Sequence, residues 1–391
     1  MQSNRHAGSC NLLRTLASVI FLSLSCAAHA AGDPVRGQTL FNVTYQCNAC
    51  HGKGIIAALN VFDISSGGTV DGLVGAIQTT AMMQQYSSTL AMNAADLADV
   101  AAYIAIGSAP NRDQHGYTGS WFEAATSGQG IEVEVYPSFH SNPSLKAATG
   151  SIFASWFTYD TSVGGADHQR WYTAFGSMVA GEPIVPLTIY QNTGGSFDAP
   201  PTTNGQPVGT ATLYFNSCSS GSFSYSFSDG TGRVGTIPLA RLTQNVTCAF
   251  ATPYPTNADF ALSGNWFDPA TSGQGFTVEV NPNSGALFLA WYTYIPNGAG
   301  AGAVGQRWYT ALGGFTSGSR SIPVTIYETT GGIFDTPTPQ APTTVAVGTG
   351  TIAFQSCSAA TFSYNFTAGT SSGRAGMINL TRVGPAAPGC T

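Results

Sequence analysis

The chain has 391 residues, with 13 lysines and arginines against 19 acidic residues and a formal net charge of −6. Charged residues make up only 8% of it, well below the roughly one quarter of an average globular protein. Lysine occurs only at Lys53 and Lys146. Such a chain has no basic face with which to neutralise phosphates, which excludes nucleic acid as a partner. Its length suits two or three domains.

The first 30 residues have the pattern of a Sec-type signal peptide. Arg5 and Arg14 give a positive start, residues 16–24 form a short apolar run, and residues 28–30 read Ala-His-Ala, a small-x-small cleavage site. We therefore expect removal of residues 1–30 and export to the periplasm of a Gram-negative-like bacterium, or secretion beyond it. No later run of 18 apolar residues follows, so the sequence predicts no transmembrane segment in the mature chain.

Residues 31–110 are predicted to form a small helical domain. Asp33 can cap a helix that has Pro34 at its first position, and Asn93 can cap a later one. In that later helix, apolar residues recur at helical spacing from Leu97 to Ile104.

Between these helices lies the strongest chemical signal of the sequence, Cys47-Asn48-Ala49-Cys50-His51. Two thiols at this spacing add to the two vinyl groups of a haem, and the histidine that follows places its imidazole at the iron. The alternative, a redox dithiol, would be expected within a βαβ unit, whereas this motif follows a capped amphipathic helix in an exported chain. The motif predicts one covalently bound haem c on Cys47 and Cys50, with His51 as an axial iron ligand.

Residues 32–106 resemble a small class I c-type cytochrome over about a fifth of the chain. The resemblance is carried by Gly32-Asp33-Pro34-x-x-Gly37-x-x-Leu40-Phe41, by residues 47–52 and by residues 96–104. It implies that the first and last helices cross, with a glycine, Phe41 and Tyr103 at the contact.

The resemblance also implies a methionine as second axial ligand, in the loop before the last helix. Met82 and Met83 lie in that loop; we favour Met83, with Met82 as the alternative, and assign Met92 to the core. The sequence departs from the pattern of the cytochrome family at two places, and both affect the expected reduction potential. Gln84 stands where a proline often follows the ligand, and residues 52–56 lack the proline that commonly supports the histidine.

The remainder of the chain is a duplication of a unit of about 130 residues. Residues 125–130, Ala-Thr-Ser-Gly-Gln-Gly, return unchanged at 270–275, and residues 169–174, Gln-Arg-Trp-Tyr-Thr-Ala, return at 306–311. A Gly-Gly-x-Phe-Asp segment also occurs in each unit, ending at Asp198 and at Asp335. The shared pattern resembles a module of exported bacterial proteins to which no activity is assigned.

Each repeat has the pattern of an all-β domain. Runs such as 131–136, 152–159, 187–190 and 223–227 are rich in aromatic and β-branched residues, and clusters of Gly, Ser, Asn and Pro separate them. We expect seven or eight strands in an antiparallel barrel or sandwich, with one repeat over residues 116–250 and the second over 260–391.

Four cysteines remain outside the signal peptide and the haem motif. In each repeat one cysteine lies on a late strand (Cys218, Cys357) and another at the C-terminal end (Cys248, Cys390). An even number in an oxidising compartment predicts disulfides. The simplest connectivity is Cys218–Cys248 and Cys357–Cys390.

Three residue types in the repeats invite functional interpretations. The six tryptophans could form a sugar-binding platform, or could fill the β cores, which large aromatic side chains dominate; they are Trp121, Trp156, Trp171, Trp266, Trp291 and Trp308. We expect Arg170 and Arg307 to pair with Glu134 and Glu279. Those two glutamates also suggest a two-carboxylate glycosidase, but each repeat would own only one such acid.

The sequence thus favours an exported mono-haem c-type cytochrome that carries single electrons to or from a redox partner protein, without substrate turnover of its own. The paired β-domains would dock a partner, a carbohydrate or a cell surface. The alternatives are a haem-containing subunit of a periplasmic redox enzyme, and a carbohydrate- or surface-binding protein in which the haem is secondary.

Overall fold

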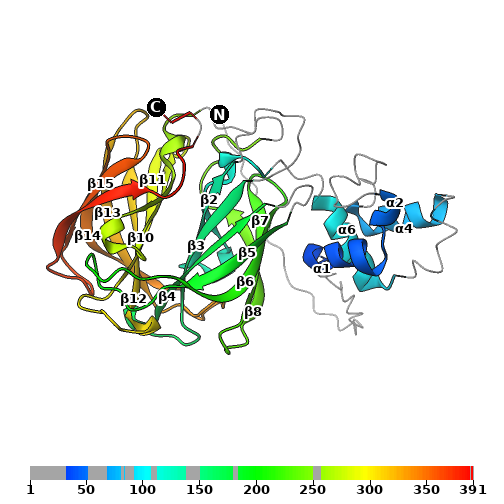
Figure 1. The fold of residues 1–391 in the computed structure, drawn as a ribbon, viewed down its shortest axis with the longest axis horizontal. Helices are drawn as coiled ribbons and strands as arrows, with labels where there is room; N and C mark the ends of the chain where they lie inside the picture. The colour runs from blue at the N-terminus through cyan, green and yellow to red at the C-terminus, as the bar shows by residue number, and fades with distance from the viewer. Residues whose placement is uncertain are drawn as a thin grey trace, which may run out of the picture. The chain divides into compact units, whose positions relative to one another are not determined.

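The computed structural model describes residues 32–51, 68–80, 83, 92–106, 112–137, 150–178, 184–249, 257–387 and 389–390 (Figure 1). The predicted signal peptide lies outside these residues. No helix among them is long and apolar enough to cross a membrane.

The N-terminal region is helical, as predicted. Its α-helices are α1 (Pro34–Thr39), which continues into a π-helical turn over Leu40–Thr44, α2 (Asn48–His51), α4 (Val70–Thr79) and α6 (Ala94–Ile106). Both predicted caps are confirmed. The Asp33 carboxylate accepts the backbone N–H groups of Val35 and Arg36, and the Asn93 side chain accepts the N–H of Asp96 at 2.9 Å.

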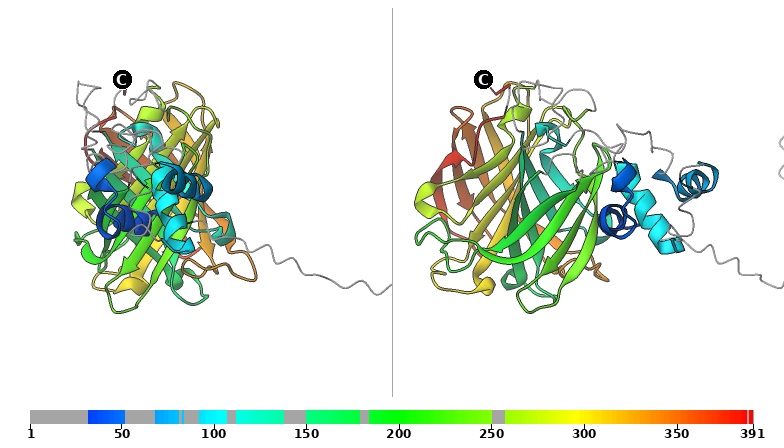
Figure 2. Two further views of the ribbon diagram at one scale, coloured as in Figure 1. Left: turned by 90° about the vertical axis from the view of Figure 1, so that its right-hand side faces the viewer. Right: turned by 45° about the vertical axis from the view of Figure 1, so that its right-hand side comes forward.

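Helices α1 and α6 pack closely against each other (blue and cyan in Figure 2). A Cβ placed on Gly37 would lie 2.0 Å from the backbone oxygen of Asp99, so only glycine allows this approach. Further along, the rings of Phe41 and Tyr103 are 5.5 Å apart, and Arg36 forms an ion pair with Asp99. The helix contact therefore has the glycine and the two aromatic residues that the cytochrome resemblance implies.

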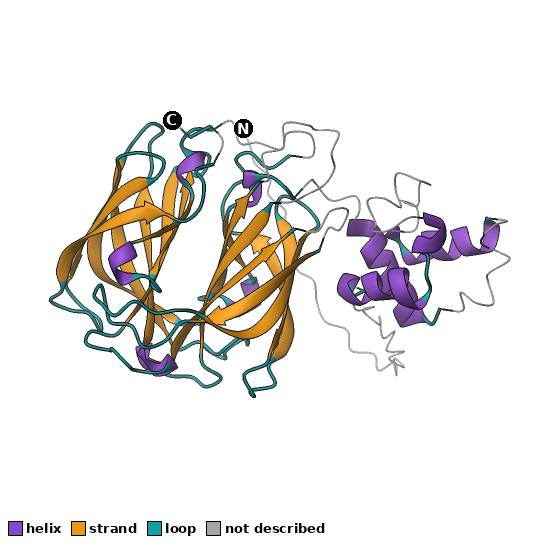
Figure 3. Cartoon of the chain, viewed as in Figure 1, coloured by secondary structure: helices purple, strands orange, loops and turns teal. Residues whose placement is uncertain are grey.

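The two repeats fold into two closed antiparallel barrels of eight strands each, which confirms the predicted fold class and decides between barrel and sandwich (Figure 3). Each strand pairs with the next along the chain, and the first strand pairs with the last to close the barrel. The first barrel contains β1 (Gly119–Phe122), β2 (Gly130–Tyr136), β3 (Ser151–Tyr159), β4 (Gln169–Ser177), β5 (Val185–Gln191), β6 (Gln206–Phe215), β7 (Ser220–Phe227) and β8 (Val234–Arg241). The second contains β9 (Gly264–Phe267), β10 (Gly275–Asn281), β11 (Ala286–Tyr294), β12 (Gln306–Gly314), β13 (Ser321–Thr330), β14 (Thr343–Phe354), β15 (Ala359–Phe366) and β16 (Ala375–Arg382).

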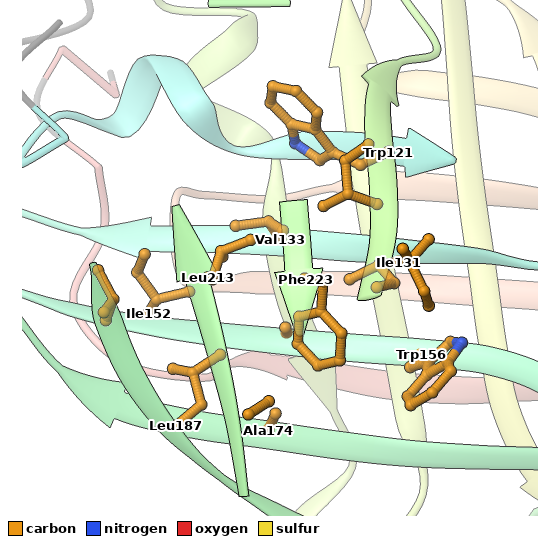
Figure 4. Close-up of a cluster of buried hydrophobic side chains, with 14 of the residues drawn as sticks. Trp121, Ile131, Val133, Ile152, Trp156, Ala174, Leu187, Leu213 and Phe223 are labelled. Atoms are coloured by element: carbon orange, nitrogen blue, oxygen red, sulfur yellow. The ribbon is translucent and has the colours of Figure 1, made fainter. Parts of the chain in front are cut away.

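The barrel interiors are filled with apolar side chains. In β8 and β16 the last five residues alternate between buried and exposed, the period expected of a strand with one face in a core. Figure 4 shows the interior of the first barrel, where strands β1 to β7 contribute Trp121, Ile131, Val133, Ile152, Trp156, Ala174, Leu187, Leu213 and Phe223.

A tryptophan and an arginine fasten the closure of each barrel. In the first, the Arg241 guanidinium lies 5.3 Å from the Trp121 ring and donates hydrogen bonds to the backbone oxygens of Gly116 and Thr118. In the second, Arg382 lies 5.4 Å from Trp266. Trp121 and Trp266, each followed by a phenylalanine in the sequence, therefore lie on the first strand of each barrel, at which the barrel closes.

Each repeat contains one disulfide bond, as predicted: Cys218–Cys248 in the first and Cys357–Cys390 in the second. They tie the C-terminal segment of each repeat back to its barrel. Loops of 30 and 33 residues correspond to about 3.7 kcal/mol of stabilisation each in the chain-entropy model.

Candidate functional site

The Cys-x-x-Cys-His motif forms one turn of helix. Gln46 has a positive φ of 50°, which turns the chain before the motif, and the N–H of Cys47 bonds the backbone oxygen of Phe41 at 2.8 Å. The N–H of His51 then bonds the oxygen of Cys47 at 3.0 Å. Because residues four apart in a helix share a face, Cys47 and His51 lie on the same side of α2.

Contacts with the helical core hold this turn in place. The Cys47 side chain is half-buried and packs against the cluster that contains Leu40, Phe41 and Tyr103. Tyr45 precedes the motif, and its hydroxyl donates to the Asp96 carboxylate of α6 at 2.5 Å. That hydrogen bond raises the pKa of Tyr45. The motif is thus anchored to the last helix on its N-terminal side.

His51 is half-buried, and burial lowers the pKa of its imidazole. The neutral imidazole is the form that coordinates iron. Burial therefore favours the form of His51 that could bind a metal ion. The side chain of Cys50 lies outside what the structure describes.

The predicted methionine ligands lie after α4. Met83 is half-buried, and its N–H bonds the backbone oxygen of Thr80 at 2.8 Å. Met82 lies outside the described residues. Met92 packs against the helical core, in agreement with its assignment as a core residue. The choice of Met83 as ligand stays a prediction.

The tryptophans do not form an exposed platform. Each of the six is at most 3% exposed, because Trp121 and Trp156 lie in the first core, Trp266 and Trp291 in the second, and the other two between the barrels. The core interpretation is confirmed for four tryptophans, the other two are buried between the barrels, and the sugar-platform interpretation is wrong.

The predicted Arg–Glu pairs within a repeat are also wrong. Arg170 forms its ion pair with Asp160, at 2.5 Å, across the turn between β3 and β4. Glu134 pairs with Arg382 of the other barrel at 2.8 Å. Arg307 donates to backbone oxygens. Glu279, the counterpart of Glu134 in repeat 2, accepts from the Ser120 N–H at 2.9 Å. Both glutamates are only 1% exposed, and these contacts give them structural roles.

Gln129 and Gln274, the glutamines of the repeated Ser-Gly-Gln-Gly segments, have a role that the sequence did not predict. Each is buried and binds the backbone of a loop from the opposite repeat. The unchanged repetition of the motif was the available signal. Among the described residues, no group of three or more His, Cys, Asp and Glu side chains is placed to hold a metal ion.

Set against known proteins, the chain matches no family model, no curated protein and no solved structure, so its function is argued from its own residues.

Proposed function

We propose that this chain is an exported c-type cytochrome with one covalently bound haem that transfers single electrons. The observation that carries the proposal is the helical turn from Cys47 to His51, which presents a thiol and an imidazole on one face. It is supported by the α1–α6 contact at Gly37, Phe41 and Tyr103. The two disulfides are typical of proteins that fold outside the cytoplasm.

The chain's residues would act as follows. Cys47 and Cys50 would form thioether bonds to the porphyrin, while His51 and Met83 would ligate the iron. The haem supplies reversible one-electron chemistry between ferric and ferrous iron. The chain's part is to favour the neutral form of His51 through burial and to anchor the segment before Cys47 to the last helix through the Tyr45–Asp96 hydrogen bond.

The paired barrels would dock this carrier to a redox partner protein or to a surface, including a carbohydrate surface. Because the tryptophans are buried, such docking would use the outward-facing side chains of the strands, which include Leu312 and Met377.

The test is to express the full chain with its signal peptide in a strain that attaches haem to c-type cytochromes. We expect an alkaline pyridine assay to give one covalent haem per chain. Cys47→Ser and Cys50→Ser should each lower that content, and His51→Ala should abolish the native spectrum. A chain that stays without covalent haem in such a strain would contradict the proposal.

The axial methionine is tested separately. Met83→Leu should remove the long-wavelength band of thioether-ligated ferric haem and lower the reduction potential, since a thioether ligand raises that potential. Met92→Leu, a matched change in the core, should leave both unchanged. Loss of the band in Met82→Leu instead would identify Met82 as the ligand.

A further inference from the structure

The two barrels meet through reciprocal contacts, in which equivalent residues of the two repeats make the same interaction. The Trp171 indole donates to the backbone oxygen of Thr293 at 3.1 Å, and the Trp308 indole donates to that of Thr158 at 2.9 Å. Each contact is thus made twice, with the roles of the two repeats exchanged. This is the pattern of an isologous dimer interface, in which both subunits use the same surface. The tandem repeats therefore pair as two subunits would.

Each repeat inserts a phenylalanine into the barrel of the other. Phe334, in the loop 331–335 of repeat 2, belongs to the core of the first barrel. Its ring lies 5.0 Å from that of Trp156 and 5.6 Å from that of Tyr225, while the Arg233 guanidinium lies 4.6 Å from its centre. The end of the first barrel is thus an aromatic pocket completed by a residue of another repeat.

Polar groups of the first barrel bind the backbone on both sides of Phe334. The amide of Gln129 donates to the oxygen of Ile333 at 3.0 Å and accepts the N–H of Asp335 at 3.1 Å. The Tyr225 hydroxyl donates to the Asp335 carboxylate at 2.5 Å. These contacts select an x-Phe-Asp sequence. The glutamine binds two backbone groups, the pocket accommodates an aromatic ring, and the tyrosine hydroxyl donates to an acidic side chain.

The second barrel binds the loop 194–198 of repeat 1 in the same way. Phe197 lies 5.0 Å from Trp291, and the Gln274 amide donates to the oxygen of Ser196 at 2.9 Å and accepts the N–H of Asp198 at 3.2 Å. Tyr364 then donates to the Asp198 carboxylate at 2.6 Å. The repeated Gly-Gly-x-Phe-Asp segment is therefore the ligand of the repeated Ser-Gly-Gln-Gly segment.

We propose that the end of each barrel is a recognition site for an x-Phe-Asp loop, and that it accepts this loop from a second copy of the chain as well as from its own. Nothing in the site requires that loop and barrel belong to one chain. The contacts are hydrogen bonds and ring packing between residues more than 75 positions apart. The inference does not depend on the proposed haem.

Buried charge determines which repeat of the second copy fits the first barrel. Glu132 is 1% exposed and stands where repeat 2 has Thr277. A pair made of two copies of repeat 1 would bury two Glu132 side chains. Burying a carboxyl group without a compensating partner costs free energy. Glu134 also accepts from the Asn265 side chain at 2.8 Å, whose counterpart in repeat 1 is Ser120. The first barrel is therefore matched to a repeat 2.

The test uses the full chain with a site for a sequence-specific protease placed within residues 251–255, between the repeats. After folding and cleavage, isotopically heavy and light preparations are mixed and analysed by native mass spectrometry. We expect repeat 1 and repeat 2 to remain bound in equal amounts. Heavy–light hybrids of repeat 1 with repeat 2 should approach the fraction that random exchange between equal pools gives, and pairs of two repeats 1 should be absent.

Variants identify the groups responsible. Gln129→Ala leaves two backbone groups of the loop unsatisfied, and we expect it to weaken the association of the cut repeats about 10-fold or more. Phe175→Ala, a change of an exposed phenylalanine on β4, should leave the association unchanged. Separation of the repeats on cleavage with both disulfides intact, or an equal abundance of paired repeats 1, would overturn the proposal. The exchange experiment on the unmutated cut chain tests the proposal without any variant, so its result stands even if a variant misfolds.

Discussion

The two repeats share a framework but differ in the charges that they bury where they meet. The loop-binding residues are the same in both: Gln129 and Gln274 bind the backbone, and Tyr225 and Tyr364 bind the aspartate. These groups must match a loop that is also repeated, so a change in one repeat would spoil a fit that the other retains. The duplication has kept the parts that are complementary in shape.

The buried acids have diverged instead. Glu134 of repeat 1 forms an ion pair with Arg382, and the two side chains are at most 1% exposed. Among the described residues, Arg241, the counterpart of Arg382 in repeat 1, forms no ion pair and donates to backbone oxygens. Glu279 accepts from the Ser120 N–H and from the Thr243 hydroxyl. Equal backbones thus leave room for unequal electrostatics, and the interface is only approximately symmetric.

The largest effects should come from the shared part. Phe334→Ala and Phe197→Ala each empty an aromatic pocket, and we expect each to lower the free energy of unfolding by about 3–5 kcal/mol. Phe175→Ala, at 42% exposure, should cost less than about 1 kcal/mol. Denaturant unfolding of the three variants checks this. If Phe334→Ala and Phe197→Ala differed widely, the two loop sites would not be equivalent.

A smaller effect should separate the repeats. Arg382→Ala leaves the Glu134 carboxylate buried without its partner, whereas Arg241→Ala removes hydrogen bonds to backbone oxygens and the contact with Trp121 but breaks no ion pair among the described residues. We expect Arg382→Ala to destabilise the chain by about 2 kcal/mol more than Arg241→Ala, from the difference between breaking a buried ion pair and losing neutral acceptors. Equal losses in the two variants would show that the Glu134–Arg382 pair contributes nothing beyond its hydrogen bonds.

Local features of the sequence were predictable because local rules determine them. The caps at Asp33 and Asn93, the alternating strands and the two disulfides all follow from residues within one element or one repeat. The choice between barrel and sandwich stayed open, because closure depends on the pairing of Trp121 with Arg241, which no local pattern encodes. The sequence located the Cys-x-x-Cys-His motif but did not predict its helical turn, and the Met83 ligand remains a prediction.

The errors arose where the partner lies in the other repeat. Arg170 and Glu134 are close in sequence, so pairing them was reasonable, but Glu134 faces an arginine 248 positions away. Gln129 carried a visible motif without a visible partner, since its ligand is a loop more than 200 positions later. An interface between two barrels of one chain has the unpredictability of an interface between two proteins.

The last predicted effect is a dependence of stability on pH at Glu132, which repeat 2 replaces by Thr277. Burial, and then the nearby Glu279, raise the pKa of Glu132 well above its ordinary value. The folded chain therefore keeps a proton that the unfolded chain releases above about pH 4.3. Stability that depends on this proton is present below that pH and is lost as pH rises toward the folded pKa, by up to about 1.4 kcal/mol per pH unit. Glu132→Gln cannot lose the proton, so its stability relative to the unmodified chain should grow with rising pH. Thermal melts from about pH 5 to about pH 8 measure this, and Thr277→Ala, which changes the mirror position without adding or removing a titrating group, should run parallel to the unmodified chain. A parallel curve for Glu132→Gln would instead mean that Glu132 is ionised in the folded state, compensated by Arg241, and that the two repeats differ less in buried charge than their sequences suggest.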